Sequence, residues 1–378
     1  MRTLLLTRNF PPLRGGMERL NARMFLHLYA HDSTSALVGP AGCQEHVPEG
    51  ASGAELPVGS LPMTMLASVA RGIVMARKIR PDIVLAGSGL TAPAAIAAAR
   101  ASGAIPAVFL HGLDIVAPSR IYRAVWWPCI RACRRVIVNS ANTRRLAIGA
   151  GVDPDRICVV NPGTDFPAPD PPGRQRFRAR LKVNATLPVL LSVGRLTTRK
   201  GLAEFVEHGF SAILATHPDA RLVIIGDQAA DALLRGTGAG FERVRAIAEA
   251  RGIARSVHWL GPCSEDELAD AYEGADVHVF PVRDLPGDVE GFGMVAIEAA
   301  AHGLPTVAFD VGGVADAVVD GRNGDLIRAE DYDAFARAVI ALLAGDKLDQ
   351  SSRARAFAQR FSWERFGSEI VEALESVT

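Results

Sequence analysis

The stretch "ADVHVFPVRDLPGDVEGFGMVAIEAAAHGLPTVAFD" (residues 275–310) decides the class of fold. Short apolar runs at 275–281 and 304–310 have the length of buried strands. Between them, the alanine-rich residues 294–302 predict a helix that begins after a Gly-Phe-Gly turn. A helix that joins two buried strands is typical of a parallel sheet, so the stretch predicts an α/β fold.

The same alternation extends through the rest of the chain, at 3–7, 82–87, 105–112, 135–140 and 157–163, and again at 187–195, 221–227 and 256–261. The proline-rich stretch 164–178 interrupts it in the manner of a linker. A chain of 378 residues is also long for a single core. We therefore predict two doubly wound, Rossmann-like domains that face each other across a cleft. The predicted parts are a first domain at 1–165, a linker at 166–178, a second domain at 179–360 and a C-terminal helix at 361–378 that returns to the first domain.

The composition excludes several classes of protein. The 41 basic and 41 acidic residues balance, so the net charge gives no general reason to bind nucleic acid. The five cysteines are scattered and odd in number, which favours a reducing compartment over a disulfide framework. Cys129 and Cys133 lack histidines at ligand spacing and are expected to pack in the core instead of binding zinc.

Membrane insertion is not predicted either. The apolar run after Met1 is too short for a signal peptide, and no window approaches the roughly 20 apolar residues that span a bilayer. We expect a soluble, cytoplasmic protein that is at most peripheral on the inner face of the membrane.

The second half of the chain begins with a candidate phosphate site, "SVGRLTTRKG" (192–201). Gly194 lets the chain turn at the end of a predicted strand, and a helix is expected to begin near Gly201. Arg195 and Lys200 then lie beside a helix N-terminus, an arrangement suited to a polyphosphate. The alternative is a solvated loop with ordinary surface charges.

The segment 288–307 adds two glutamates, Glu290 and Glu298, with seven residues between them. Gly291 and Gly293 let backbone N–H groups approach a ligand where the helix begins. Glu290 could accept hydrogen bonds from sugar hydroxyls, and Glu298 could bind both hydroxyls of a ribose. The alternative makes Glu290 a turn residue and Glu298 a surface charge, but the apolar neighbours of Glu298 disfavour a solvated position.

Taken together, these motifs resemble glycosyltransferase family 4, which contains retaining enzymes of the GT-B fold. The glutamate pair with Gly-Phe-Gly is similar to the family signature, and "GRLTTRKG" (194–201) to its phosphate-binding Arg and Lys. "FDVGGVADAVVDGRNGDLI" (309–327) resembles its Gly-Gly loop, and "RNFPPLRGGMERL" (8–20) its first glycine loop. The resemblance covers nearly the whole chain, and is greatest to mannosyltransferases that act on phosphatidylinositol or other lipid-linked acceptors.

The resemblance implies a role for each candidate residue. Arg195 and Lys200 would hold the donor diphosphate and neutralise it as the sugar–phosphate bond breaks. Glu290 would contact the donor sugar, Glu298 the nucleotide ribose, and His111 the C6 hydroxyl of the sugar. His111 could instead be an ordinary strand-end histidine. The rest of the implied donor-binding set is Gly15, Gly16, Gly194, Gly291, Phe292, Gly293, Met294 and Val295.

The resemblance also implies a reaction. The enzyme would be a retaining hexosyltransferase that needs no metal or other cofactor, and the acceptor hydroxyl would attack on the face of the leaving group. GDP-mannose is the donor we expect, and a lipid-linked or saccharide acceptor the partner, in glycolipid or polysaccharide biosynthesis. A UDP-sugar donor, a nucleotide-sugar epimerase or phosphorylase, and a non-catalytic nucleotide-sugar binder are the alternatives.

Three further motifs have competing interpretations. Residues 119–135 interleave arginines with Trp126 and Trp127, which suits a membrane interface and equally an ordinary helix with its tryptophans in the core. "DPD" at 153–155 imitates a metal motif but lies in a proline-containing turn. "GTGAG" at 236–240 imitates a dinucleotide-binding loop but follows a helical run instead of a strand.

Overall fold

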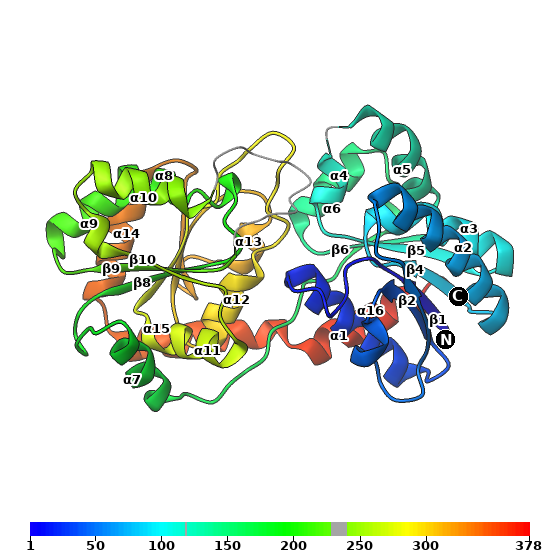
Figure 1. The fold of residues 1–378 in the computed structure, drawn as a ribbon, viewed down its shortest axis with the longest axis horizontal. Helices are drawn as coiled ribbons and strands as arrows, with labels where there is room; N and C mark the ends of the chain where they lie inside the picture. Colours follow the sequence, from blue (N-terminus) through cyan, green and yellow to red (C-terminus); the bar gives the residue numbers. More distant parts are fainter. Residues whose placement is uncertain (118, 228–239) are drawn as a thin grey trace. The chain divides into compact units, whose positions relative to one another are not determined.

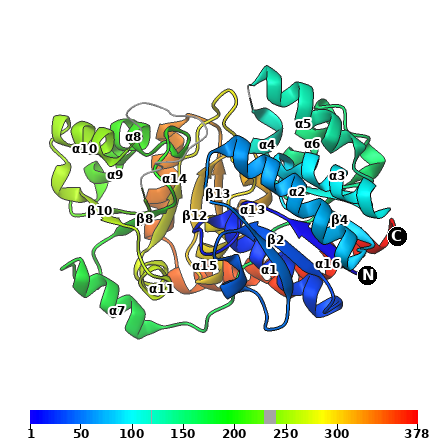
Figure 2. The ribbon, with the colours of Figure 1, turned by 45° about the vertical axis from the view of Figure 1, so that its right-hand side comes forward.

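The computed structural model describes residues 1–117, 119–227 and 240–378 (Figure 1), so all of the "GTGAG" motif except Gly240 lies outside the described residues. The chain divides into two compact units. Unit 1 consists of Met1–Gly163 and Phe361–Thr378, and unit 2 of Thr164–Arg360. In each unit, helices cover a central sheet (Figure 2).

Unit 1 contains a seven-stranded sheet in the order β3-β2-β1-β4-β5-β6-β7, in which neighbouring strands are parallel. Its strands are β1 (Thr3–Leu6), β2 (Ala36–Pro40), β3 (Ser52–Leu56), β4 (Ile83–Ala86), β5 (Ile105–Leu110), β6 (Arg135–Val138) and β7 (Ile157–Val159). Its main helices are α1 (Gly16–His31), α2 (Leu61–Ile79), α3 (Ala92–Ser102), α4 (Leu113–Val116), α5 (Arg120–Ala132), α6 (Ala141–Gly149) and α16 (Trp363–Glu375). Helix α3 packs between α2 and α5, whereas α1 packs against α16.

Unit 2 contains a six-stranded parallel sheet in the order β10-β9-β8-β11-β12-β13. Its strands are β8 (Val189–Val193), β9 (Arg221–Ile225), β10 (Val257–Gly261), β11 (Val277–Phe280), β12 (Thr306–Phe309) and β13 (Gly324–Ile327). Its main helices are α7 (Pro171–Arg180), α8 (Leu202–Phe205), α9 (Ser211–Thr216), α10 (Phe241–Ala250), α11 (Glu265–Gly274), α12 (Met294–Ala301), α13 (Val314–Ala317), α14 (Tyr332–Ala344) and α15 (Lys347–Ala358). Helix α7 packs on α11 and α12 on α15, while α14 packs on α9.

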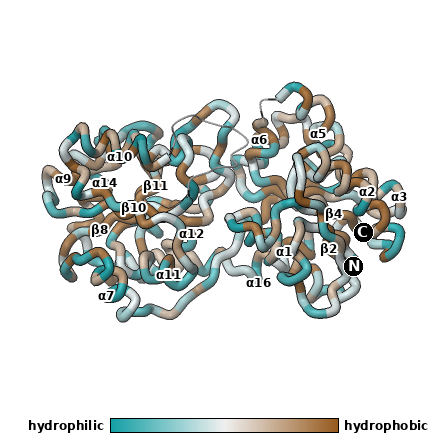
Figure 3. The backbone as a smooth tube through the Cα atoms, viewed as in Figure 1, coloured by the Kyte–Doolittle hydropathy of each residue, from teal (hydrophilic) through white to brown (hydrophobic). Residues whose placement is uncertain are grey.

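The strands form the cores of both units, and Figure 3 shows them as the most apolar parts of the chain. Because helices cover both faces of a parallel sheet, its strands are continuous apolar runs, which is why the sequence predicts the α/β class correctly. In both sheets the strand order reverses once, between β1 and β4 and between β8 and β11. Ligands of doubly wound sheets bind at such switch points, beyond the carboxyl ends of the strands.

The last helix, α16, belongs to unit 1. Trp363, Phe366, Ile370 and Leu374 are buried at helical spacing. The Phe366 ring lies 6.3 Å from that of Phe109 at the end of β5. The chain therefore leaves unit 2 after α15 and completes the core of unit 1.

Some elements differ from the predictions. Helix α7 begins at Pro171, inside the stretch 166–178 that we predicted to be a linker. A proline in the first turn of a helix forfeits no intrahelical hydrogen bond, so Pro171 and Pro172 begin this helix instead of preventing it. Strands β2, β3 and β13 were not predicted, because β2 contains Gly39 and ends at Pro40, and β3 and β13 lack an apolar run.

Candidate functional site

The two chain segments at the switch point of unit 2 are held against each other. After β8, Gly194 adopts φ +138°, and Gly201 adopts φ +67°, conformations that favour glycine. A Cβ at Gly201 would overlap the carbonyl oxygen of Pro281, just after β11. The Arg283 amide also donates to the Arg199 carbonyl at 2.8 Å. The predicted phosphate-binding segment is thus packed on the segment that leads to Glu290.

Lys200 and Glu290 form an ion pair at this point. Lys200 Nζ donates to Glu290 Oε2 at 2.9 Å and lies 4.5 Å from the centre of the Phe280 ring. Burial lowers the pKa of Lys200, and this effect outweighs the attraction of Glu290. Burial would raise the pKa of Glu290, but the charges of Arg199 and Lys200 outweigh it and bring that pKa to about 2. Glu290 is therefore an anion at any physiological pH.

Arg199 is a member of this cluster that the sequence analysis missed. Its Nη1 donates to the same Glu290 Oε2, and its Nε donates to Asp288 Oδ1 at 2.9 Å. The Arg199 side chain is 14% exposed, so the pairing takes place largely away from solvent. The only signal in the sequence is its position next to Lys200, which does not tell where a long side chain points.

Arg195 occupies a different environment from Lys200. Its side chain is exposed, and among the described residues no ion pair or hydrogen bond to it is found. Arg195 nevertheless lies close enough to Lys200 for its charge to lower the pKa of Lys200, though less than burial does. The structure therefore leaves one cation of the predicted pair open to a ligand and holds the other on Glu290.

The glycine turn after Glu290 is tightly packed. The Gly313 amide donates to the Glu290 carbonyl at 2.9 Å, and a Cβ at Gly313 would overlap the Gly291 carbonyl oxygen. Gly293 adopts φ +99° and caps α12, which begins at Met294 as predicted. The first amides of a helix have no intrahelical acceptor, so this end can receive an anion. Phe292 is buried, and Val295 packs against the core of unit 2.

Glu298 lies on α12 and is 9% exposed, which excludes the alternative of a solvated surface charge. Its Oε2 accepts a hydrogen bond from the Tyr272 hydroxyl at 3.1 Å. The Tyr272 ring in turn stacks on His302 at 5.2 Å. Nothing in the sequence marks Tyr272 as a partner of Glu298, because they lie on different helices.

The predicted residues of unit 1 lie after β1 and β5. Gly15 precedes α1 with φ +156°, and both it and Gly16 are exposed. A Cβ at Gly15 would overlap Glu18, which accepts a hydrogen bond from Asn9 at 2.7 Å. His111 is buried, and its Nε2 donates to the Gly87 carbonyl at 2.9 Å, just after β4. His111 thus lies beside the switch point of unit 1 with one ring nitrogen satisfied.

The tryptophans of residues 119–135 are engaged within unit 1. Trp126 Nε1 donates to the Leu90 carbonyl at 2.8 Å, and Trp127 packs against the core. The large apolar side chains that α5 exposes are Ile121 and Val125, at 73% and 47%. The interpretation of an ordinary helix therefore holds for the rings, whereas the outer face of α5 remains apolar and basic.

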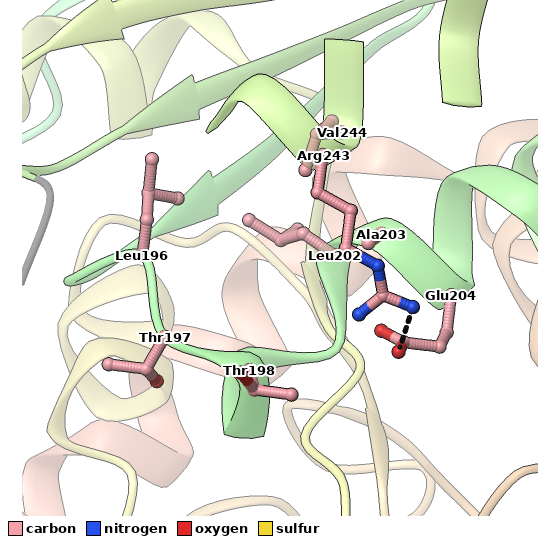
Figure 4. A pocket seen from close by; sticks show the side chains of 8 residues that line it. All are labelled: Leu196, Thr197, Thr198, Leu202, Ala203, Glu204, Arg243 and Val244. Atoms are coloured by element: carbon pink, nitrogen blue, oxygen red, sulfur yellow. Dashed lines mark ion pairs between the residues drawn. The ribbon is translucent and has the colours of Figure 1, made fainter. Parts of the chain in front are cut away.

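The cavity beside residues 195–202, the predicted phosphate-binding segment, is too small for a donor. It has room for about one water molecule, and Figure 4 shows its lining. Arg243 of α10 pairs with Glu204 of α8 at 2.9 Å, and Thr197 and Thr198 line the cavity from the loop that precedes α8. The segment 195–202 is thus supported from behind by packed side chains.

No metal-binding cluster is found within 1–117, 119–227 and 240–378, where no three His, Cys, Asp or Glu side chains are grouped suitably. The "DPD" motif forms a turn, as predicted, in which Asp153 accepts from the Asp155 amide at 3.1 Å. Of the helices that the structure describes, none is long and apolar enough to cross a bilayer.

Two family models match the chain and together account for most of it. The model of glycosyl transferases group 1 matches residues 173–358, and that of Glycosyltransferase Family 4 matches residues 14–166. The chain belongs to glycosyltransferase family 4. The first model contains the Arg199–Lys200–Glu290 cluster and Glu298, and the second contains Gly15, Gly16 and His111.

Curated relatives of this glycosyltransferase family 4 member include two D-inositol 3-phosphate glycosyltransferases. The protein of Geodermatophilus obscurus is 36% identical over 63% of this chain and 52% of its own length. The protein of Acidothermus cellulolyticus is 35% identical over 62% of this chain and 51% of its own length. The chain spans about half the length of the curated relatives it matches.

Solved structures identify the fold as GT-B. Anabaena HepE in complex with UDP and glucose matches with a TM-score of 0.81 and 21% identity over 100% of both chains. Sucrose-phosphate synthase from Thermosynechococcus elongatus matches with a TM-score of 0.79 and 21% identity over 100% of this chain and 99% of that one. At this identity the likeness concerns the fold alone.

Proposed function

We propose that this protein is a retaining hexosyltransferase that moves a sugar from a nucleoside diphosphate to an acceptor hydroxyl. The observation that carries the proposal is the charge cluster at the switch point of unit 2, where Arg195 is open to a ligand and Lys200 lies 2.9 Å from Glu290. Negative charge builds on the leaving diphosphate as the sugar departs. Cations fixed in advance stabilise that charge without reorganisation.

The arrangement of the acidic residues supports the binding of a nucleotide sugar. Glu290 accepts from two cations through Oε2, and Oε1 has no hydrogen-bond partner within the described part of the chain. Oε1 can therefore accept from a sugar hydroxyl. Glu298, held by Tyr272 on α12, is proposed to accept from the ribose hydroxyls. The amides of Gly293, Met294 and Val295 would face the phosphates at the helix end.

The state of Glu290 bears on the stereochemistry. A retaining enzyme that used a double displacement would need a carboxylate nucleophile. Glu290 is the carboxylate that we propose to contact the donor sugar, but two cations hold it and keep its pKa at about 2, which weakens it as a nucleophile. We therefore propose attack by the acceptor on the leaving-group face, with the departing phosphate taking the hydroxyl proton and no metal taking part.

The donor and acceptor are proposed by chemistry and similarity. GDP-mannose remains our expected donor, and a UDP-hexose is the alternative that the UDP-bound structure of Anabaena HepE favours. The names of the curated relatives favour a phosphorylated inositol as the acceptor headgroup. If that headgroup belongs to a lipid, the exposed Ile121 and Val125 of α5, flanked by arginines, would contact the membrane.

The first test is a thermal-shift panel of GDP, UDP, ADP and their hexose conjugates. A ligand that binds the native state raises the melting temperature, so a rise with one nucleotide family identifies the donor. Mass spectrometry then follows hexose transfer to inositol 3-phosphate and to phosphatidylinositol in vesicles, and NMR gives the anomer. Absence of any nucleotide-dependent rise would refute the proposal, product without acceptor would indicate an epimerase, and a requirement for free phosphate would indicate a phosphorylase.

Two variants test the residues. Lys200→Ala and Arg195→Ala should each lower kcat by roughly 10²–10³, the usual loss when one charge-stabilising donor is removed. Arg255→Ala, which changes an arginine outside the cluster on the turn before β10, is the matched control and should retain its rate. Near-normal kcat in the Lys200 variant would remove the central element of the proposed mechanism.

A further inference from the structure

The carboxylate of Glu290 has two cationic partners where one would suffice for an ion pair. Arg199 and Lys200 both donate to Oε2, and Arg199 alone is held in turn by an acid, Asp288 at 2.9 Å. The two partners therefore differ. Arg199 is fixed between two carboxylates, whereas Lys200 has Glu290 as its only acidic partner among the described residues.

Under the proposed function Lys200 has a second task, because it must bind the donor diphosphate. A diphosphate carries more negative charge than a carboxylate and attracts the ammonium group. Moving Lys200 away from Glu290 would leave a carboxylate that is 14% exposed without that partner, which is costly unless another cation remains. Arg199 can remain, because its Nε bond to Asp288 and its backbone bond to Arg283 do not involve the ligand.

We propose that Arg199, braced by Asp288, is a positioning residue that holds Glu290 as an oriented anion and so releases Lys200 to the donor diphosphate. The inference rests on the proposed function of the same cluster. Arg199 does not touch the diphosphate in this scheme. It acts by lowering the free energy needed to separate Lys200 from Glu290.

The inference makes a prediction about affinity that does not depend on turnover. Without Arg199, Lys200 would be the only cation on Glu290, and the carboxylate would compete more strongly for it. Arg199→Gln should therefore weaken the binding of a nucleoside diphosphate by about tenfold. Removing the competing charge as well, in Arg199→Gln/Glu290→Gln, should restore affinity to near the wild-type value.

Isothermal titration of the full chain with GDP and with UDP tests this. Arg199→Lys keeps one charge beside Glu290 and should bind within about threefold of the wild type, and circular dichroism spectra report whether each variant is folded. A purely structural role of Arg199 would make the double variant no better than the single one, and that result would overturn the inference.

The outcomes separate the two proposals. If the wild type binds GDP or UDP and Arg199→Gln binds equally well, the inference fails while the proposed function stands. If the wild type binds neither nucleotide, the proposed function fails and the inference fails with it. Should Arg199→Gln not fold, Asp288→Asn provides the second variant, because it removes the carboxylate that holds Arg199 in place. An affinity of Asp288→Asn equal to that of the wild type would also overturn the inference.

Discussion

The ionisation of Glu290 should make the stability of unit 2 depend on acid pH in a way that a single substitution removes. Arg199 and Lys200 bring the pKa of Glu290 from 4.5 to about 2 in the folded chain. One pKa unit corresponds to about 1.4 kcal/mol, so the ionised carboxylate contributes about 3 kcal/mol to folding at neutral pH. Because the folded-state pKa is the lower one, this contribution is present above pH 4.5 and is lost as the pH falls towards 2.

The variant Glu290→Gln lacks this titration. Between neutral pH and about pH 3.5 the wild type should lose about 1 kcal/mol more than the variant, because the carboxylate takes up a proton in the unfolded chain before it does so in the folded one. For a unit of this size the loss corresponds to roughly 2–4 °C in melting temperature. Scanning calorimetry of both proteins at the two pH values measures the difference. The test concerns the change in melting temperature with pH and not its value at neutral pH, so a uniformly lower melting temperature of the variant does not affect it.

A matched control changes an acid that takes no part in the cluster. Glu249 lies on α10 with its side chain 61% exposed, and Glu249→Gln should follow the wild-type curve. If the melting temperatures of wild type and Glu290→Gln fall in parallel, Glu290 is not held as an anion by its neighbours, and the reasoning from the ion-pair cluster is refuted.

Three other predictions concern packing, binding and metals. Gly313→Ala places a methyl group on the Gly291 carbonyl and should destabilise unit 2 by about 2 kcal/mol or more in calorimetry, whereas Gly149→Ala, with open space around it in α6, should not. Tyr272→Phe removes one hydrogen bond to Glu298 and should weaken nucleotide binding several-fold in calorimetric titration, less than Glu298→Ala does. Transfer activity should persist in EDTA, and a loss that manganese restores would overturn the metal-free mechanism.

The sequence predicts those strands whose residues are apolar because the whole strand is buried. The runs that became β1, β4, β5, β8, β9 and β11 are largely buried on both faces and mostly apolar, since helices cover both sides of a parallel sheet. Strand β3 at the edge of unit 1 reads SGAEL, and only Leu56 in it is buried. An edge strand is covered less, so its residues are constrained less and its pattern is weaker.

In the candidate site, too, some features could be predicted from the sequence and others could not. Backbone requirements are visible in a sequence, because only glycine readily adopts the conformations of Gly194, Gly201 and Gly293, and a strand end must precede them. Pairings between long side chains are not visible. Arg199 and Glu290 are far apart in the chain, and the arginine next to Lys200 could equally have pointed to solvent. The sequence thus indicates where the backbone turns of a candidate site lie, but not which charged side chains pair with one another there.

Charge balance at this cluster offers a physical basis for preferring a nucleotide sugar over simpler anions. Arg195, Arg199 and Lys200 provide three positive charges and Asp288 and Glu290 two negative ones, so the cluster has a net charge of +1 before a ligand arrives. A free phosphate would pair with Lys200 and separate it from Glu290, but it would offer the carboxylate no hydrogen-bond donor as a replacement. A nucleotide sugar offers a new partner to each member of the ion pair. Its diphosphate pairs with Lys200, and its sugar hydroxyls donate hydrogen bonds to Glu290 in place of the ammonium group. Under the proposed function, a ligand that pairs with Lys200 but offers no hydrogen-bond donor to Glu290 should therefore bind more weakly than a nucleotide sugar.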